Sequence, residues 1–186
     1  MNKLTFEEEI QSVIREAECL HDQATVRKAI DRLSHEIADT LGDRYPLVLT
    51  VLNGGLFFTA ELLLKLPFPL ELDSIKAGRY RGETTGADMH WSLTPSISLM
   101  DRTVLILDDI LDEGYTLKAI NSFAKDAGAR EILSAVLVDK QIETPKASSA
   151  DFVGLTTPNR YLFGYGLDYK NQLRHWPGIF ACKTVY

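Results

Sequence analysis

The segment from Thr103 to Leu117 constrains the fold of this chain more than any other. A short apolar run, Thr103–Leu107, passes directly into Asp108 and Asp109, and Gly114 follows before a helical pattern begins. A continuous apolar run of this kind is typical of a strand that is covered on both faces. The order of strand, turn and helix therefore predicts a parallel α/β arrangement around this segment.

The rest of the chain alternates between helix-like and strand-like patterns. Helical periodicity predicts helices at Glu7–His21, Thr25–Leu41, Leu56–Leu66 and Thr116–Ala127. Apolar runs predict strands at Pro46–Leu52, Leu70–Lys76, Thr103–Leu107, Glu131–Val138, Phe152–Gly154, Tyr161–Tyr165 and Ile179–Val185. We expect residues 1–186 to form one α/β domain, with a twisted and mainly parallel sheet flanked by helices, because this length suits a single buried core.

The composition excludes several classes of protein. The formal net charge is -6 and the basic residues are scattered, so bulk electrostatics does not predict nucleic-acid binding. The N-terminus is acidic, without a signal-peptide core, and no apolar run reaches the length of a membrane span. Cys19 and Cys182 form neither a disulfide framework nor a metal-binding spacing. We expect a cytoplasmic protein that binds anions only at a local site.

The glycine turn that precedes the expected helix at Thr116–Ala127 has the features of an anion site. Gly114 permits a positive φ angle and a close approach of the backbone to a ligand. The N–H groups and the dipole at a helix start favour an anion there. The hydroxyl of Thr116 can donate a hydrogen bond to the same anion. The segment lacks the ending of a Walker loop and the spaced glycines of a dinucleotide fingerprint. An ordinary strand–turn–helix unit with acids capping the helix is the alternative interpretation.

Three aspartates lie before Gly114. Adjacent residues of a strand point to opposite faces, so Asp108 and Asp109 are not expected to face the same phosphate. Carboxylates accept hydrogen bonds from the cis-diol of a ribose, directly or through water on a metal ion. Asp112 lies nearer to the turn, where it is placed to face a heterocycle.

The segment Val104–Leu117 resembles the motif with which type I phosphoribosyltransferases bind phosphoribosyl pyrophosphate (PRPP), and it is most similar to the hypoxanthine-guanine phosphoribosyltransferases. The resemblance covers most of the chain from about Leu47 onward. It implies that the two adjacent acids hold the ribose hydroxyls, that the turn holds the 5′-phosphate, and that Asp112 is the catalytic residue at the purine N7. The implied PRPP-binding residues are Asp108, Asp109, Asp112, Glu113, Gly114, Tyr115 and Thr116, of which Glu113 and Tyr115 depart from the family's commonest residues.

Further stretches support the same resemblance. Leu52-Asn53-Gly54-Gly55 resembles the family's first loop, whose backbone meets pyrophosphate through a cis peptide in many members. Asn53 stands where many members have lysine or arginine, and Arg174 falls where the family places an arginine on pyrophosphate. The implied purine-binding residues are Lys140 at the 6-oxo group, Tyr161 stacked on the base, Leu162 through its backbone, and Asp168, which would also hold Mg²⁺.

The polar stretch Gly78–Met100 is too long for an ordinary connection. The resemblance implies that it is a lid that excludes water, with Arg79 and Tyr80 at its root, and Arg79 departs from the usual serine. The implied organisation is N-terminal helices over residues 6–41, a core over 46–154 and a purine hood of C-terminal strands over 151–186.

The implied function is Mg²⁺-dependent transfer of a phosphoribosyl group from PRPP to hypoxanthine or guanine. The resemblance also implies a homo-oligomer, a dimer or tetramer, and the N-terminal helices could contribute apolar contact area between its subunits. Adenine is disfavoured, because Lys140 and a 6-amino group both donate hydrogen bonds. A xanthine-preferring enzyme and a non-catalytic nucleotide-binding regulator remain alternatives. A hydrolase is disfavoured, because the histidines form no metal-spaced pair and no Gly-x-Ser-x-Gly element occurs.

Overall fold

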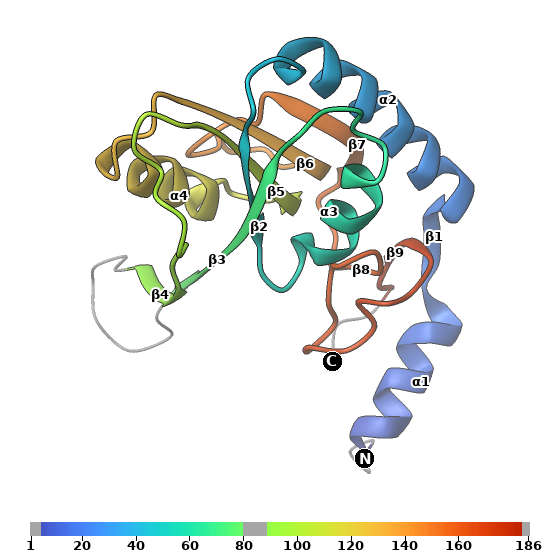
Figure 1. The fold of residues 1–186 in the computed structure, drawn as a ribbon. Helices are drawn as coiled ribbons and strands as arrows, with labels where there is room; N and C mark the ends of the chain where they lie inside the picture. Colours follow the sequence, from blue (N-terminus) through green and yellow to red (C-terminus); the bar gives the residue numbers. More distant parts are fainter. Residues whose placement is uncertain (1–4, 80–88, 184–186) are drawn as a thin grey trace.

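The computed structural model describes residues 5–79 and 89–183, which form a large mixed sheet with helices on both faces and a small second sheet (Figure 1). The large sheet has the strand order β4-β3-β2-β5-β6-β7, and all neighbours are parallel except β3 and β4. Its strands are β2 (Leu47–Val51), β3 (Glu71–Arg79), β4 (Met89–Leu93), β5 (Thr103–Leu111), β6 (Glu131–Gln141) and β7 (Phe152–Pro158). The expected mainly parallel α/β architecture is confirmed.

The two faces of the sheet are covered by different helices. Helices α2 (Gln23–Leu41) and α3 (Gly55–Leu63) lie on one face, and α4 (Tyr115–Asp126) lies on the other (Figure 1). Side chains alternate along β5, so that Leu105 packs in the core cluster shared with α2 and α3, while Ile106 packs in the cluster shared with α4. Burial on both faces explains why these strands are apolar throughout.

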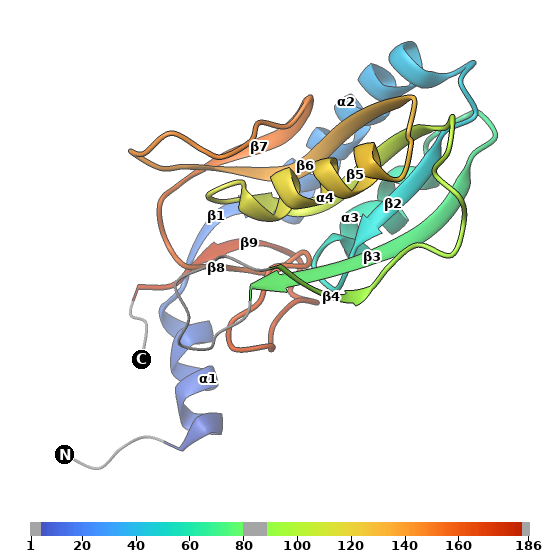
Figure 2. The same cartoon turned by 90° about the vertical axis from the view of Figure 1, so that its left-hand side faces the viewer.

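The small sheet brings the two ends of the chain together. Its strands are β1 (Glu18–Asp22), β9 (Gly178–Ala181) and β8 (Leu162–Phe163), paired antiparallel in the order β1-β9-β8. Helix α1 (Phe6–Glu16) precedes β1 and projects beside this sheet (Figure 2). The expected hood is therefore present, but an N-terminal strand completes it, so it is not built from C-terminal strands alone.

The expected helix Glu7–His21 is wrong in its second half. Helix α1 begins with a capping box at Thr5 and ends at Glu16, and Ala17 has an extended ψ angle of 144°. Residues after it pair with β9, and the side chain of Leu20 packs against the main core. The apolar positions fitted one helical stripe, but pairing with a strand distant in the sequence decided the local conformation.

Several strands extend beyond their expected carboxyl ends. Strand β5 continues through Asp108 and Asp109 to Leu111, and β6 continues to Gln141. Strand β3 continues to Arg79 and pairs with β4 in the stretch Gly78–Met100, where no strand was expected. Residues 80–88, including Tyr80 of the expected lid, lie outside the described residues. No helix of the described ranges is long and apolar enough to cross a membrane.

Candidate active site

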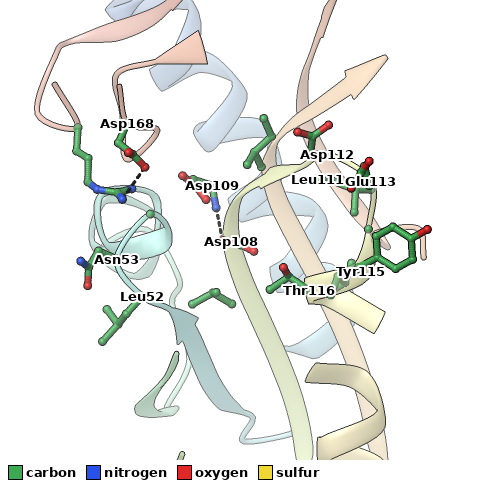
Figure 3. A pocket seen from close by; sticks show the side chains of 16 residues that line it. Leu52, Asn53, Asp108, Asp109, Leu111, Asp112, Glu113, Tyr115, Thr116 and Asp168 are labelled. Carbon is green, nitrogen blue, oxygen red and sulfur yellow. Dashed lines mark hydrogen bonds and ion pairs between the residues drawn. The ribbon is translucent and has the colours of Figure 1, made fainter. Parts of the chain in front are cut away.

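A cavity of about 430 Å³ lies where β2 and β5 end, and Figure 3 shows the side chains that border it. Two loops and one C-terminal segment form its wall. The lining residues are Val51–Gly54, Asp108–Leu117, Asp168 and Arg174. The sequence motif and the expected pyrophosphate residues therefore meet at one place, although Arg174 is distant from them in the chain.

The glycine turn has the geometry that its sequence predicts. Gly114 has a φ angle of 80° and immediately precedes α4, and the N–H of Lys118 donates to the carbonyl of Gly114 over 3.0 Å. The N–H groups in the first turn of a helix have no partner within that helix, so this turn presents donors and a positive dipole end. Thr116 borders the cavity beside them. The turn can therefore hold a phosphate group.

A second segment, residues 146–148, packs against this turn and was missed in the sequence. The N–H of Ala147 donates to the carbonyl of Glu113 over 2.9 Å, and a Cβ atom at Gly114 would lie 2.8 Å from backbone atoms of Ser148. The Nζ atom of Lys146 donates to the carbonyl of Leu111 over 2.8 Å and forms a close ion pair with Asp139. A single lysine in a polar connection carries no signal of such a contact.

Asp108 and Asp109 are buried, with 8% and 7% exposure. They lie on opposite sides of β5, with Asp109 on the side of Asp168, yet both border the cavity (Figure 3). Burial, and then the negative charge of Asp109, raises the pKa of Asp108 well above its usual range. Burial also raises the pKa of Asp109, against the opposing effects of a hydrogen bond with Asp108 and the charge of Arg174.

Glycines allow three segments to meet at Asp109. A Cβ atom at Gly54 would lie 2.2 Å from Oδ2 of Asp109, and one at Gly166 would lie 2.1 Å from the carbonyl oxygen of Gly54. The peptide bond between Leu52 and Asn53 is cis. The loop Leu52-Asn53-Gly54-Gly55 is thus held against β5 by close backbone approach, as its glycine content favours.

A second cavity shares a wall with the first. It is bordered by Asp109, Ile110, Asp112, Lys140, Tyr161, Leu162, Leu167 and Asp168, which include every residue expected at the purine. The Nζ atom of Lys140 lies 2.9 Å from Oδ2 of Asp112, although β5 and β6 supply them separately. Two of the residues expected to contact the base therefore contact each other.

Asp168 is held by two neighbours. Its Oδ1 atom lies 2.6 Å from a guanidinium nitrogen of Arg174, and its Oδ2 atom accepts from the N–H of Asn171 over 2.7 Å. Arg174 also donates to the carbonyl of Gly166 over 2.6 Å. Among residues 5–79 and 89–183, no three His, Cys, Asp or Glu side chains are grouped as a metal cage. The carboxylate of Asp168 offers oxygen ligands of the kind that Mg²⁺ prefers, and this ion commonly keeps water and substrate oxygens as its other ligands.

The expected site residues other than those of the lid are thus gathered at the two cavities. Asn53, Glu113 and Tyr115, which depart from the family pattern, all border the first cavity. Arg79 ends β3, and its side chain, like Tyr80, lies outside the described part of the structure.

Comparison with known proteins identifies relatives across most of the chain. Residues 16–170 match the family model described as phosphoribosyl transferase domain. The hypoxanthine-guanine-xanthine phosphoribosyltransferase of Tritrichomonas foetus is 32% identical, with 90% of this chain and 92% of that protein covered. The hypoxanthine-guanine phosphoribosyltransferase of Bacillus subtilis is 30% identical, with 89% and 93% covered. The similarity thus begins well before Leu47, the start suggested by the motifs.

Solved structures agree with this result. A hypoxanthine-guanine-xanthine phosphoribosyltransferase structure superposes with a TM-score of 0.81 at 29% identity, and the match covers 91% of this chain and 99% of the other. A hypoxanthine phosphoribosyltransferase from Staphylococcus aureus gives a TM-score of 0.86 at 24% identity, with 92% and 95% covered, and shows the same fold.

Proposed function

Because this chain belongs to the phosphoribosyltransferase family, we propose that it transfers the 5-phosphoribosyl group of PRPP to a 6-oxopurine, hypoxanthine or guanine, and releases pyrophosphate in purine salvage. The observation that carries this proposal is the shared wall of the two cavities. Asp109, Ile110, Asp112 and Asp168 border both of them. A sugar phosphate in the first cavity and a base in the second would meet at this wall.

We assign the 5′-phosphate to the turn formed by Asp112–Thr116. The start of α4 supplies backbone donors and Thr116 supplies a hydroxyl, a donor set that suits a phosphate. Asp108 and Asp109 would accept hydrogen bonds from the ribose hydroxyls. Asp108 already accepts a hydrogen bond from the N–H of Asp109, and sugar hydroxyls would supply further donors to these two adjacent buried carboxylates.

We assign the base to the second cavity. Lys140 would donate to the 6-oxo group, which favours hypoxanthine and guanine over adenine, since a 6-amino group is itself a donor. Asp112 would accept or orient the N7 proton as N9 attacks. The 2.9 Å contact between these two side chains supports roles for both at one edge of the base. Tyr161 would stack on the ring and Leu162 would meet its edge through backbone groups.

The chemistry requires positioning and charge stabilisation rather than a protein nucleophile. The bond from ribose C1 to pyrophosphate breaks while the purine nitrogen attacks, so the ribose gains positive charge and the leaving group gains negative charge. The loop at Asn53 and Gly54 and the guanidinium of Arg174 would contact the pyrophosphate. A Mg²⁺ ion held by Asp168 and the pyrophosphate oxygens would supply positive charge at the leaving group.

An assay of pyrophosphate release tests this proposal. The enzyme is incubated with PRPP and Mg²⁺, and hypoxanthine, guanine, xanthine or adenine is added in turn. We expect release with hypoxanthine or guanine and little with adenine. Release that is fastest with xanthine would support the alternative of a xanthine-preferring enzyme, which the name of the Tritrichomonas foetus relative keeps open. Nucleotide binding without release with any base would indicate a non-catalytic regulator instead.

We infer that the enzyme is a homo-oligomer. The apolar stripes of the N-terminal helices, which the sequence suggested as contact area between subunits, do not serve this purpose. The apolar stripe of α1 packs on the small sheet, and that of α2 packs in the main core. Apolar area is instead exposed on and after α3, at Leu56, Phe57 and Leu64. Sedimentation at micromolar concentration should give at least a dimer, and a monomer would reject the inference.

A further inference from the structure

Helix α1 lies almost entirely outside the matched family domain, yet it packs against the small sheet that borders the purine cavity. The domain match begins at residue 16, whereas α1 spans Phe6–Glu16. The buried residues Val13, Phe163, Tyr169, Leu173 and Cys182 form a cluster of their own, and Ile10 and Ile14 pack against it. The helix thus shares a small core with the hood and is not an independent appendage (Figure 2).

A polar contact joins the helix to the hood through Tyr169. The hydroxyl of Tyr169 donates to Oε1 of Glu9 over 2.6 Å, and the same Oε1 atom lies 2.7 Å from Nζ of Lys170. Tyr169 is fully buried, and the side chain of Glu9 is only 14% exposed. A buried tyrosine hydroxyl requires a hydrogen-bond partner, and α1 supplies one to Tyr169.

The other side of Tyr169 contacts the residue assigned to stack on the base. The ring centroids of Tyr161 and Tyr169 are 5.4 Å apart, and the ring planes meet at 67°, which is a favourable edge-to-face arrangement. Tyr161 borders the second cavity and is 40% exposed, so packing alone restrains it weakly. The buried ring of Tyr169 is therefore a fixed support for a less buried ring.

We propose that Glu9 and Tyr169 are positioning residues for the purine, with Glu9 holding the Tyr169 ring and that ring setting the orientation of Tyr161. This inference rests on the proposed function, because it requires a purine at Tyr161. It assigns a role in base binding to α1, which contributes no residue to either cavity at the site.

Steady-state kinetics with matched variants tests the proposal. Glu9→Ala removes the acceptor, and Tyr169→Phe removes the donor but keeps the ring. Each should raise the purine KM about 3- to 10-fold, the effect of one hydrogen bond, and leave the PRPP KM unchanged. The double variant should be no worse than either single variant, because both remove the same contact. Glu9→Gln keeps an oxygen acceptor and should restore nearly the wild-type purine KM.

Control variants separate positioning from a general loss of stability. Glu7→Gln and Arg15→Gln change exposed residues of the same helix away from the contact with Tyr169. Both should retain the wild-type purine KM. The proposal is rejected if Glu9→Ala raises the KM values for purine and PRPP equally, or if Glu9→Gln behaves like Glu9→Ala.

Amide hydrogen exchange distinguishes failure of this inference from failure of the proposed function. In Tyr169→Phe, exchange at Leu162 and Phe163 should be faster, while exchange in β5 should be unchanged. If the wild-type enzyme shows no purine-dependent pyrophosphate release, the proposed function fails and the purine role of Tyr169 fails with it. If the wild-type enzyme is active but exchange and purine KM are unchanged in the variant, this inference alone is wrong.

Discussion

The turn at the start of α4 and the hood are built in different ways, which suit the two different recognition tasks that the proposed function gives them. The turn is one continuous piece of chain, and its backbone is fixed by β5, by α4 and by contact with Ser148. The hood, together with Lys140 of β6, gathers side chains from distant places, namely Glu9, Tyr161 and Tyr169. A phosphate needs several donors at one point, which a backbone turn supplies, whereas a base edge needs separate groups placed around a plane.

The comparison predicts which changes affect one substrate and which affect both. Glu9, Lys140, Tyr161 and Tyr169 should influence the purine alone, and supports of the turn should influence PRPP alone. Asp112 should influence both substrates, because it begins the turn and also contacts Lys140. The following predictions test this division in order of decreasing effect.

Asp112→Asn should cause the largest loss. The substitution keeps the shape and one oxygen of the side chain but removes the charge that would take or orient the N7 proton. We expect kcat to fall about 10²- to 10⁴-fold if Asp112 is a general base, while the fold and the affinity for a nucleoside monophosphate remain close to wild type. Stopped-flow turnover and nucleotide titration measure the two quantities. Wild-type turnover, with chemistry shown to limit the rate, would remove Asp112 from the mechanism.

Lys140→Ala should affect the purine and spare PRPP. Losing one hydrogen bond to a charged donor removes roughly 1.5–3 kcal/mol, and this loss should appear in kcat/KM for hypoxanthine and guanine. Asp112, whose side chain is 48% exposed, would be hydrated after it loses its partner, so the stability of the fold should hardly change. PRPP affinity measured by calorimetry should be unchanged. An unaltered purine kcat/KM would show that Lys140 is only a surface charge.

Lys146→Met should affect PRPP and spare the purine. The substitution removes the hydrogen bond to the carbonyl of Leu111 and the ion pair with Asp139, both of which support the turn. We expect the PRPP KM to rise by a factor of about 5 to 30, equivalent to roughly 1–2 kcal/mol. Lys125→Met, an exposed change on α4, is the matched control. A purine KM that rises as much as the PRPP KM would contradict the division between the two regions.

Asp108→Asn should give the smallest effect, a gain in stability of the free enzyme. Burial raises the pKa of Asp108 in the folded state, so its contribution to stability is complete below the unfolded pKa and declines as pH rises through the folded pKa. At neutral pH the amide should stabilise the fold by on the order of 1 kcal/mol, or about 2–4 °C in Tm. The difference in Tm should vanish as pH falls toward the ordinary aspartate value of 3.8. A difference that persists in acid would point to packing instead of ionisation.

The two regions also differ in how far the sequence predicted them. The strand before Asp108, the positive φ of Gly114 and the start of α4 near Thr116 were predicted from local pattern and are observed. Each depends on residues close in the chain, where backbone conformation and side-chain alternation apply directly. The extension of β5 to Leu111 was not predicted, because pairing with β6 continues where the apolar run has ended.

The hood was predicted less well, and the reason is physical. Glu7–His21 was assigned to one helix, although β1 within it pairs with β9 at the other end of the chain. The contact of Tyr169 with Glu9 joins residues at opposite ends of the sequence, and neither a tyrosine nor a glutamate at these positions predicts such a contact. The support of the turn by Lys146 is equally nonlocal in character, since it depends on a loop folding back onto β5.

The sequence by itself determined the alternating α/β order, the glycine turn before α4 and the types of residue that the proposed function assigns to a ribose, a phosphate and a 6-oxopurine. Only the tertiary structure decided that Lys140 meets Asp112, that Arg174 meets Asp168, and that α1 belongs to the hood. Local conformation depends on side-chain period and glycine content, which can be read along the chain. Contacts between distant segments depend on which surfaces pack once the strands have paired, so they emerge only from the assembled fold.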